Sequence, residues 1–303
     1  MRVEGKSWLK LVALLLSLCV CVLCVCVSGD LGLQDNIKAV NAGDSWNSYI
    51  SPIMDAQFHL ENALSCEDCS IDLSYKDSGL ALIVAKSDRP ILAKISQGDR
   101  SETFYIHNDG TQSTVLLPFG NGDYEITILE KKEDKVGSVK YQTAFSVWSM
   151  NDLQAFCNAT DYVPFNKNSE YVKEASRLKK MAESDEQLVA LIVQQVMRHL
   201  DYDQSMTEVG HRPDLDLVWT SRKAVCRDYA VITAAMLRSQ GIPTKVLYGD
   251  VMFSNGTKGY HAWNEYYAGN AGWVRLDVTY MERGESLDRN NDFEILYEAS
   301  KVF

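Results

Sequence analysis

The chain has 303 residues, of which 46 % are apolar and 23 % are charged, a composition that is ordinary for a folded protein and argues against disorder. This length accommodates roughly two domains and a substantial core. The formal net charge is −11 and the pI is near 5.0. Because a protein that binds nucleic acid needs a basic face, the charge argues against a nucleic-acid partner.

A basic and then apolar segment begins the sequence. Three basic residues precede an apolar run over residues 11–27, and the small residues Ser28 and Gly29 follow it. This order is typical of a secretory signal peptide, and the run also approaches the length of a membrane-spanning helix. We expect residues 1–29 to be a cleaved signal peptide or a retained N-terminal membrane anchor. Either places the remainder outside the cytoplasm, secreted or at the cell surface, with a membrane contact only through an uncleaved segment.

Cys66 and Cys69 form a Cys-x-x-Cys motif after this segment. Two thiols supply too few ligands for a closed zinc site, and the sequence indicates no metal site and no cofactor. Outside the cytoplasm a local disulfide is the expected state of this pair, and a redox-active dithiol is the alternative.

The next part of the chain has the texture of a β-rich domain, which we assign to residues 30–150. Turn signals such as Asn-Asp-Gly separate short runs of β-type residues. The spacing predicts a small antiparallel β-sandwich, with strands over residues 79–85, 103–107, 113–117, 124–129 and 141–147. Before them, residues 46–64 carry an amphipathic pattern that predicts a helix interrupted at Pro52.

Helical periodicity marks the start of the second domain, which we assign to residues 169–303. The less regular residues 151–168 are interpreted as the linker between the domains. Tyr171, Val172, Ala175 and Leu178 fall on one helical stripe. A second helix is predicted after Ser184, because Ser-Asp-Glu-Gln matches a capping box.

Residues 226–239 predict a buried helix that begins at Cys226 and stops before Gly241. At a helix N-terminus the backbone dipole stabilises a thiolate, and the free N–H groups there can also stabilise an oxyanion. Cys226 therefore stands where a nucleophile would be useful. The alternative is a small buried residue without chemistry.

Three strands are predicted after this helix, over residues 244–251, 259–267 and 273–280. Period-2 alternation places His261 and Trp263 on one face, and Asp277 lies on the neighbouring strand, within hydrogen-bond reach of His261. A thiolate that attacks a carbonyl, an imidazole that moves the proton and a carboxylate that orients the imidazole make up a Cys-His-Asp triad.

These motifs resemble those of the transglutaminase-like superfamily. The resemblance rests on Val-Cys-Arg-Asp-Tyr-Ala at 225–230, Tyr-His-Ala-Trp-Asn-Glu at 260–265 and Gly-Trp-Val-Arg-Leu-Asp-Val-Thr at 272–279, and it covers about 190–281. The chain is also similar to exported bacterial members of this superfamily in the Tyr-Asp element that begins at Tyr202. The implied fold class is α+β: a papain-like core, in which the helix that carries the cysteine packs on an antiparallel sheet, preceded by the β-sandwich-like domain.

The resemblance also implies the roles of the site residues. Cys226 would be the nucleophile, His261 the base and acid, and Asp277 the orienting carboxylate. For the second oxyanion donor and the site walls the candidates are Tyr202, Trp219 and Trp263, each of which could equally be a packing aromatic.

The implied activity is that of a thiol enzyme acting on a protein or peptide substrate. A glutamine or peptide amide would form a thioester at Cys226, and the acyl group would pass to an amine or to water, as in a transglutaminase or a cysteine protease. The alternative is a non-catalytic, envelope-associated binding or scaffold protein that retains the fold.

Overall fold

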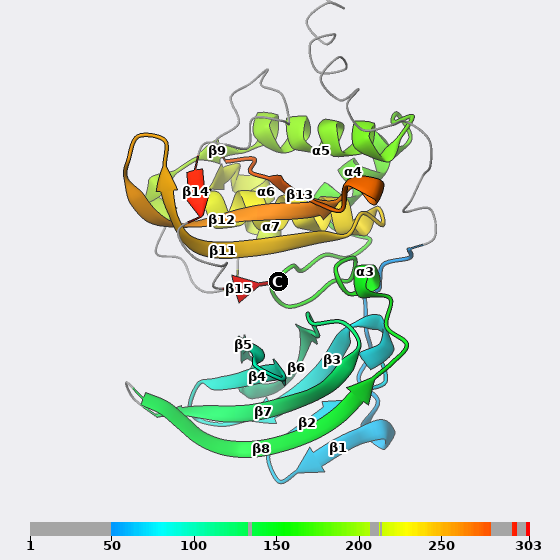
Figure 1. Ribbon diagram of the computed structural model, residues 1–303, viewed down its shortest axis with the longest axis vertical. Helices are drawn as coiled ribbons and strands as arrows, with labels where there is room; N and C mark the ends of the chain where they lie inside the picture. The colour runs from blue at the N-terminus through cyan, green and yellow to red at the C-terminus, as the bar shows by residue number, and fades with distance from the viewer. Residues whose placement is uncertain (1–49, 133–134, 207–211, 213, 280–292, 296–300) are drawn as a thin grey trace, which may run out of the picture.

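The computed structural model describes residues 50–132, 135–206, 212, 214–279, 293–295 and 301–303. They form an N-terminal β part and a C-terminal part of helices and strands, stacked along the long axis of the molecule (Figure 1). The predicted leader, residues 1–29, lies outside the described residues. None of the helices in the described ranges is long and apolar enough to cross a membrane.

The N-terminal part consists of two four-stranded antiparallel sheets, with strand orders β1-β2-β3-β6 and β5-β4-β7-β8. Alternating residues of the strands, such as Ile83, Ile95 and Ile126, are fully buried and form the core. The predicted β-sandwich-like fold is confirmed. The strands are β1 (Ala63–Cys66), β2 (Cys69–Asp72), β3 (Leu80–Lys86), β4 (Ile91–Gln97), β5 (Arg100–Ile106), β6 (Asp109–Leu116), β7 (Gly122–Lys132) and β8 (Lys135–Val147).

The prediction of a helix over residues 46–64 is wrong for residues 50–64, the part of it that the structure describes. Residues 50–59 are irregular, and a short 3₁₀ helix, η1 (Leu60–Asn62), leads into β1. Side chains of the sandwich satisfy the backbone here, since Gln112 accepts the Phe58 N–H at 3.1 Å and Asp72 accepts the His59 N–H at 2.7 Å. These tertiary hydrogen bonds replace the helical ones, so the amphipathic pattern was misleading.

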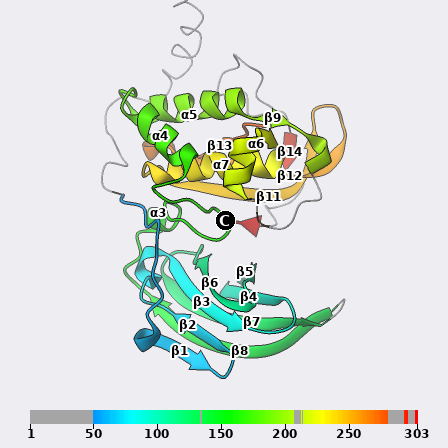
Figure 2. The same cartoon turned by 180° about the vertical axis from the view of Figure 1, so that it is seen from behind.

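The C-terminal part is an antiparallel sheet of order β13-β12-β11-β14, with β15 also paired to β11, and four helices cover one of its faces (Figure 2). This is the predicted α+β core, with the helix that begins at Cys226 against the sheet. The strands are β11 (Thr244–Phe253), β12 (Lys258–Tyr267), β13 (Trp273–Leu276), β14 (Phe293–Ile295) and β15 (Lys301–Val302). The helices are α4 (Glu170–Lys179), α5 (Asp185–His199), α6 (Leu215–Ser221) and α7 (Cys226–Ser239).

The helix boundaries follow the local signals in the sequence. All four predicted stripe residues of α4 are buried. The Ser184 hydroxyl accepts the Gln187 N–H at 3.2 Å and caps α5 as predicted. Helix α7 covers the predicted residues, and Gly241 follows it with φ at 87°, a left-handed conformation that favours glycine.

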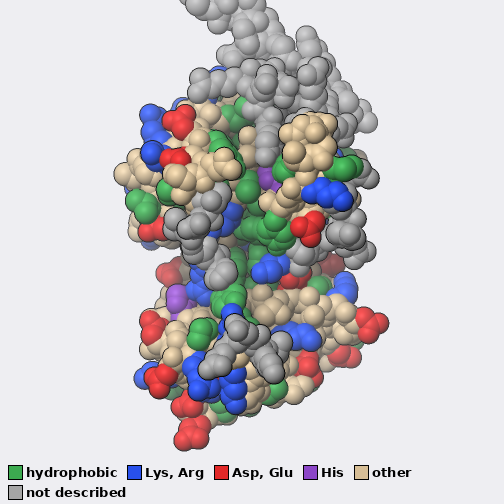
Figure 3. All heavy atoms as spheres, turned by 90° about the vertical axis from the view of Figure 1, so that its left-hand side faces the viewer, with side chains coloured by type: hydrophobic (Ala, Val, Ile, Leu, Met, Phe, Trp, Pro, Cys, Tyr) green, Lys and Arg blue, Asp and Glu red, His purple; other side chains and the backbone are tan. Residues whose placement is uncertain are grey.

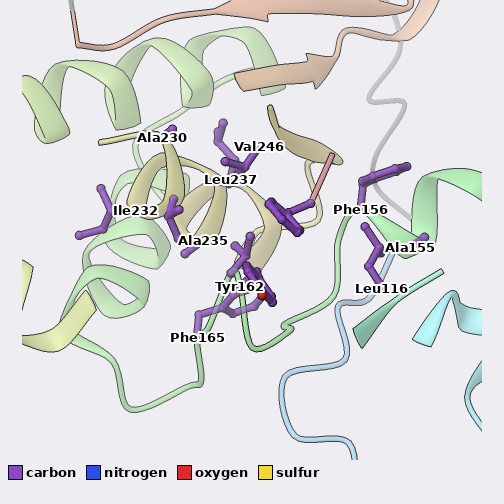
Figure 4. Close-up of a cluster of buried hydrophobic side chains, with 14 of the residues drawn as sticks. Leu116, Ala155, Phe156, Tyr162, Phe165, Ala230, Ile232, Ala235, Leu237 and Val246 are labelled. Carbon is purple, nitrogen blue, oxygen red and sulfur yellow. The ribbon is translucent and has the colours of Figure 1, made fainter. Parts of the chain in front are cut away.

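The segment predicted as a linker, residues 151–168, is not an exposed tether. It contains a short helix, α3 (Asp152–Ala155), and then the buried aromatic residues Phe156, Tyr162 and Phe165. In Figure 4, Tyr162 and Phe165 lie below α7, among the buried side chains that connect the two parts. One continuous hydrophobic cluster therefore extends from the sandwich to α7.

Asn158 ties this segment to both parts of the molecule. Its side chain accepts the Ile53 N–H at 2.9 Å and donates to the Ser78 carbonyl at 2.7 Å. Its backbone carbonyl accepts a hydrogen bond of 3.1 Å from the fully buried Arg238 of α7. Because a buried polar group is costly unless paired, these bonds fix the segment against both parts.

Candidate active site

Cys226 is the first residue of α7, and the residues around it hold the start of the helix in place. The Asp228 carboxylate accepts the Val225 N–H at 3.0 Å, and the Arg227 guanidinium pairs with the same carboxylate at 3.0 Å. Asp228 is buried, so this network is rigid. The first N–H groups of a helix have no acceptor within the helix, which leaves the Cys226 end able to bind an oxyanion.

A short parallel pairing positions the turn before this helix. Strands β9 (Asp201–Tyr202) and β10 (Lys223–Ala224) pair through bonds from the Asp201 N–H to the Arg222 carbonyl at 2.7 Å and from the Asp203 N–H to the Ala224 carbonyl at 2.9 Å. The pairing brings the Tyr202 region, distant in sequence, to the N-terminus of α7.

His261 and Asp277 meet on neighbouring segments of the sheet. The His261 Nε2–H donates to Asp277 Oδ2 at 2.7 Å, and both side chains are buried. The strand predicted over 273–280 ends earlier, at Leu276, so Asp277 lies just beyond β13. The cause is local: the other carboxylate oxygen of Asp277 accepts the Thr279 N–H at 3.0 Å and turns the chain away from β12.

The protonation of His261 is set by its two partners. Burial alone would lower its pKa, but hydrogen bonds to Asp277 and to Cys226, with the negative charges of both groups, raise the pKa of His261 to about 9. Since Nε2 is bound to Asp277, the Cys226 thiol is left with Nδ1. The three predicted residues therefore meet in one hydrogen-bonded chain, and the imidazolium is favoured at neutral pH.

The triad opens into a cavity of about 330 Å³ that lies where the two parts of the molecule meet. Its walls are mainly aromatic: Tyr105, Tyr162, Tyr248, Tyr260 and Phe303. Side chains from the sandwich, the 151–168 segment, the sheet and β15 thus complete one site. On the face shown in Figure 3, hydrophobic side chains gather between the upper and lower parts, with Lys and Arg side chains beside them.

The wall residues are fixed by stacking and backbone contacts. Tyr162 stacks on Phe303 with ring centroids 4.4 Å apart, and its hydroxyl accepts the Tyr105 N–H at 2.7 Å. Tyr248 and Tyr260, on paired strands, stack at 6.3 Å. Such aromatic pairs hold a defined shape at low entropic cost, as a substrate cavity requires.

The three aromatic candidates for the oxyanion donor or the walls lie in different places. Tyr202 is close enough to Cys226 that burial and the thiolate charge raise its pKa. Trp263 is buried, and its ring stacks on that of His261 at 6.3 Å. Trp219 packs on His199 at 3.7 Å and does not line the cavity. Tyr202 and Trp263 thus adjoin the triad, whereas Trp219 packs between helices.

No pattern in the sequence indicated a role for most of the wall residues. Tyr105 and Tyr162 come from segments without chemical motifs, and Lys301 and Phe303 come from the end of the chain. Arg227, the residue after the cysteine, also lines the cavity. A sequence signal existed for the described lining residues within the recognised motifs, which are Val225, Arg227, Tyr260 and Ala262 besides the cysteine and the histidine.

A larger cavity, of about 400 Å³, lies on the other side of the 151–168 segment. Its lining includes the carboxylates of Asp55, Asp161, Asp214 and Asp216 but contains neither cysteine nor histidine among the described residues. Asp161 is already paired with Arg212 at 3.0 Å. We place the site at the smaller cavity because only that one holds a nucleophile beside a base.

Cys66 and Cys69 lie far from this cavity, directly opposite each other in the β1–β2 hairpin. Both are free thiols here, and burial together with the Cys66 sulfur raises the pKa of Cys69 to about 12. The pairing places the two residues within reach of a disulfide, which stays a prediction. Within the described ranges no group of three or more His, Cys, Asp or Glu side chains is arranged to hold a metal ion.

Comparison with known proteins is consistent with this geometry. Residues 173–278 match the family model of the transglutaminase-like superfamily. A search of curated proteins finds no match.

Solved structures provide more distant matches. The periplasmic domain of TgpA from Pseudomonas aeruginosa is 18 % identical over 72 % of this chain and 72 % of that one, with a TM-score of 0.35. Red sea bream transglutaminase is 13 % identical over 69 % of this chain and 49 % of that one, with a TM-score of 0.29. On the family match, residues 173–278, which hold all three triad residues, are a transglutaminase-like superfamily domain.

Proposed function

We propose that this protein is a thiol enzyme that forms a thioester at Cys226 with a glutamine or peptide amide and transfers the acyl group to an amine or to water. The proposal rests on one observation above all: His261 is held by Asp277 at 2.7 Å and hydrogen-bonds Cys226 at the start of α7. A non-catalytic scaffold has no need of a buried, charge-stabilised imidazole that faces a thiol.

The acylation step uses all three residues. The Cys226 thiolate attacks the amide carbon, and the resulting oxyanion is stabilised by the N–H groups at the start of α7. His261, protonated at neutral pH, donates its proton to the departing nitrogen, so ammonia or an amine leaves and the thioester remains. Asp277 keeps the imidazole oriented and favours its cationic form throughout.

Deacylation reverses the proton movement. His261 takes a proton from the incoming amine or water, which attacks the thioester carbonyl, and the thiolate leaves. An amine acceptor gives a new amide, whereas water gives a carboxylic acid. We also propose that this chemistry takes place outside the cytoplasm, because of the basic and apolar leader pattern over residues 1–29.

Mass spectrometry tests the proposed function. The protein is incubated with a glutamine-containing peptide, with and without a primary amine, and the masses of the protein and of the peptide are then measured. We expect an acyl adduct on Cys226 and either an amine-linked or a deamidated or cleaved peptide. Cys226→Ala should give no adduct and no product, whereas Cys66→Ala, a matched change at a distant and partly exposed thiol, should behave as wild type. Product formation by Cys226→Ala would refute the thioester mechanism.

A further inference from the structure

The cavity at Cys226 carries positive charge in a protein whose formal net charge is −11. Arg227 and Lys301 both line it, and no described lining residue is an Asp or Glu. Asp277 is behind His261, and Asp228 is buried against Arg227. A cationic cavity in an acidic protein draws anions to that point of the surface and repels cations.

Lys301 is held beside the triad by the backbone of β15. In the sheet Lys301 is paired with Tyr248, and Tyr248 is paired on its other side with Ala262, the residue after His261. The adjoining Phe303 exchanges backbone bonds of 2.7 and 2.9 Å with Val246, and its carbonyl accepts a bond of 2.7 Å from Arg238. The position of the lysine is therefore set by the backbone.

The charge of Lys301 is not matched by an ion pair with any carboxylate in the described part of the chain. Glu102 lies close enough to sense it, but that carboxylate accepts the Val302 N–H at 3.2 Å. Burial raises the pKa of Glu102 to about 7, so it is only partly ionised at neutral pH. Glu102 therefore compensates the positive charge of the Lys301 ammonium only in part.

We propose that the acyl donor of this site is an acidic peptide, with a carboxylate next to the reacting amide that Lys301 and Arg227 bind between the tyrosine walls. This inference rests on the proposed function, because it concerns the same cavity, and it adds the class of substrate. A carboxylate meets the Lys301 ammonium there, beside the Arg227 guanidinium that already pairs with Asp228. The rings of Tyr105 and Tyr162 contact the apolar part of the peptide. A cationic donor would meet repulsion at the same place.

Two alkylating reagents that differ only in charge test the inference without a known substrate. Iodoacetate and iodoacetamide both alkylate a thiolate, and the ratio of their rates at Cys226 cancels the intrinsic reactivity of the thiol. We expect Lys301→Met to lower the iodoacetate-to-iodoacetamide ratio roughly threefold to tenfold at low salt, and 1 M salt to reduce the difference. Lys301→Arg should keep the ratio, which also shows that the altered strand folds. Lys173→Met, a matched change on the exposed face of α4, should leave the ratio as in wild type.

Peptide pairs then identify the source of the carboxylate. Glutamine peptides that carry Asp or its isostere Asn beside the glutamine, and peptides with a free or an amidated C-terminus, are compared by kcat/KM. We expect either the Asp or the free-acid member of its pair to be preferred several-fold, with the preference lost in Lys301→Met.

The two failures are distinguishable. If iodoacetamide alkylates Cys226 no faster than it alkylates the unfolded chain, the proposed function fails. If Cys226 reacts fast but Lys301→Met leaves the reagent ratio unchanged, the anionic-donor inference is overturned and the proposed function stands.

Discussion

Replacing Asp277 with Asn tests how the carboxylate acts on the rest of the triad. An amide has nearly the shape of the carboxylate, and its oxygen can still accept the His261 Nε2–H that now lies 2.7 Å away. It carries no charge, however. The variant therefore keeps the geometry and removes the electrostatic stabilisation of the imidazolium.

The size of the effect follows from the pKa of His261, which lies at about 9, well above the ordinary histidine value of about 6.5. At about 1.4 kcal/mol per pKa unit, the imidazolium gains about 3 kcal/mol from Asp277 and Cys226 together, after the cost of burial. The hydrogen bond to Asp277 is the largest of the interactions that raise the pKa of His261. We expect Asp277→Asn to forfeit about 2 kcal/mol and to reduce the thiolate–imidazolium pair roughly tenfold to fiftyfold at neutral pH.

The assay is the rate of Cys226 alkylation by iodoacetamide between pH 5 and pH 10. The thiolate is the form that reacts, and the His261 imidazolium is its ion-pair partner. Asp277→Asn should therefore react about tenfold or more slowly at pH 6 to 7.5. The two rates should converge above about pH 9, where His261 loses its proton in the wild type as well. Asp250→Asn, the same change at an exposed carboxylate of β11, serves as the control.

The same substitution has a predictable effect on stability. A histidine whose pKa is higher in the folded than in the unfolded state stabilises the fold below the unfolded pKa, and this stabilisation is lost as the pH rises through the folded pKa. The free energy of unfolding of wild type should exceed that of Asp277→Asn by about 2 kcal/mol at pH 6, and the difference should shrink above pH 9. Superimposable pH–rate profiles for wild type and Asp277→Asn would refute the reasoning.

Three further predictions concern other parts of the molecule. Cys226→Ala should retain the wild-type circular dichroism spectrum and lose acyl transfer; a variant that loses the fold instead would show that the thiol is structural. Arg238→Met should remove the guanidinium from three backbone carbonyls and leave those of Asn158 and Thr244 without that donor, whereas the Phe303 carbonyl keeps the Val246 N–H. The expected cost is about 3 kcal/mol or more in urea unfolding, and an unchanged midpoint would count against this. Glu102, with its pKa raised by burial to about 7, binds a proton more readily in the folded chain than in the unfolded chain. As the pH rises from about 4.5 to 7, the free energy of unfolding of wild type should therefore fall relative to that of Glu102→Gln. Parallel curves of stability against pH would contradict the raised pKa of Glu102.

Local signals in the sequence were sufficient for the elements that carry the chemistry. Helix α7 spans the predicted residues because Cys226 begins an apolar run and Gly241 ends it. The hairpin of β11 and β12 follows from an Asn-Gly turn and strand alternation, and the family motifs lie on these elements. Caps, turns and periodicity depend on residues a few positions apart, so they can be read without knowledge of the fold.

The errors occurred where distant residues satisfy the backbone. In the region before β1, hydrogen bonds from backbone N–H groups to the side-chain oxygens of Asp72 and Gln112 replace the predicted helix. The early end of the strand at Asp277 is the exception, because its cause is local: the carboxylate accepts the N–H of Thr279, two residues later. The segment predicted as a linker, residues 151–168, is also held by distant contacts, since Asn158 bonds to both parts. Apart from the bond between Asp277 and Thr279, these contacts have no local sequence pattern.

By itself, then, the sequence determined the α+β class and the order in which a thiol, an imidazole and a carboxylate occur. The tertiary structure decided what surrounds them. Tyr105, Tyr162 and Lys301 are brought to one cavity from the sandwich, the connecting segment and the last strand. Their meeting depends on how the two parts pack, and packing is a sum of many weak contacts between residues far apart in the chain, which no local pattern records.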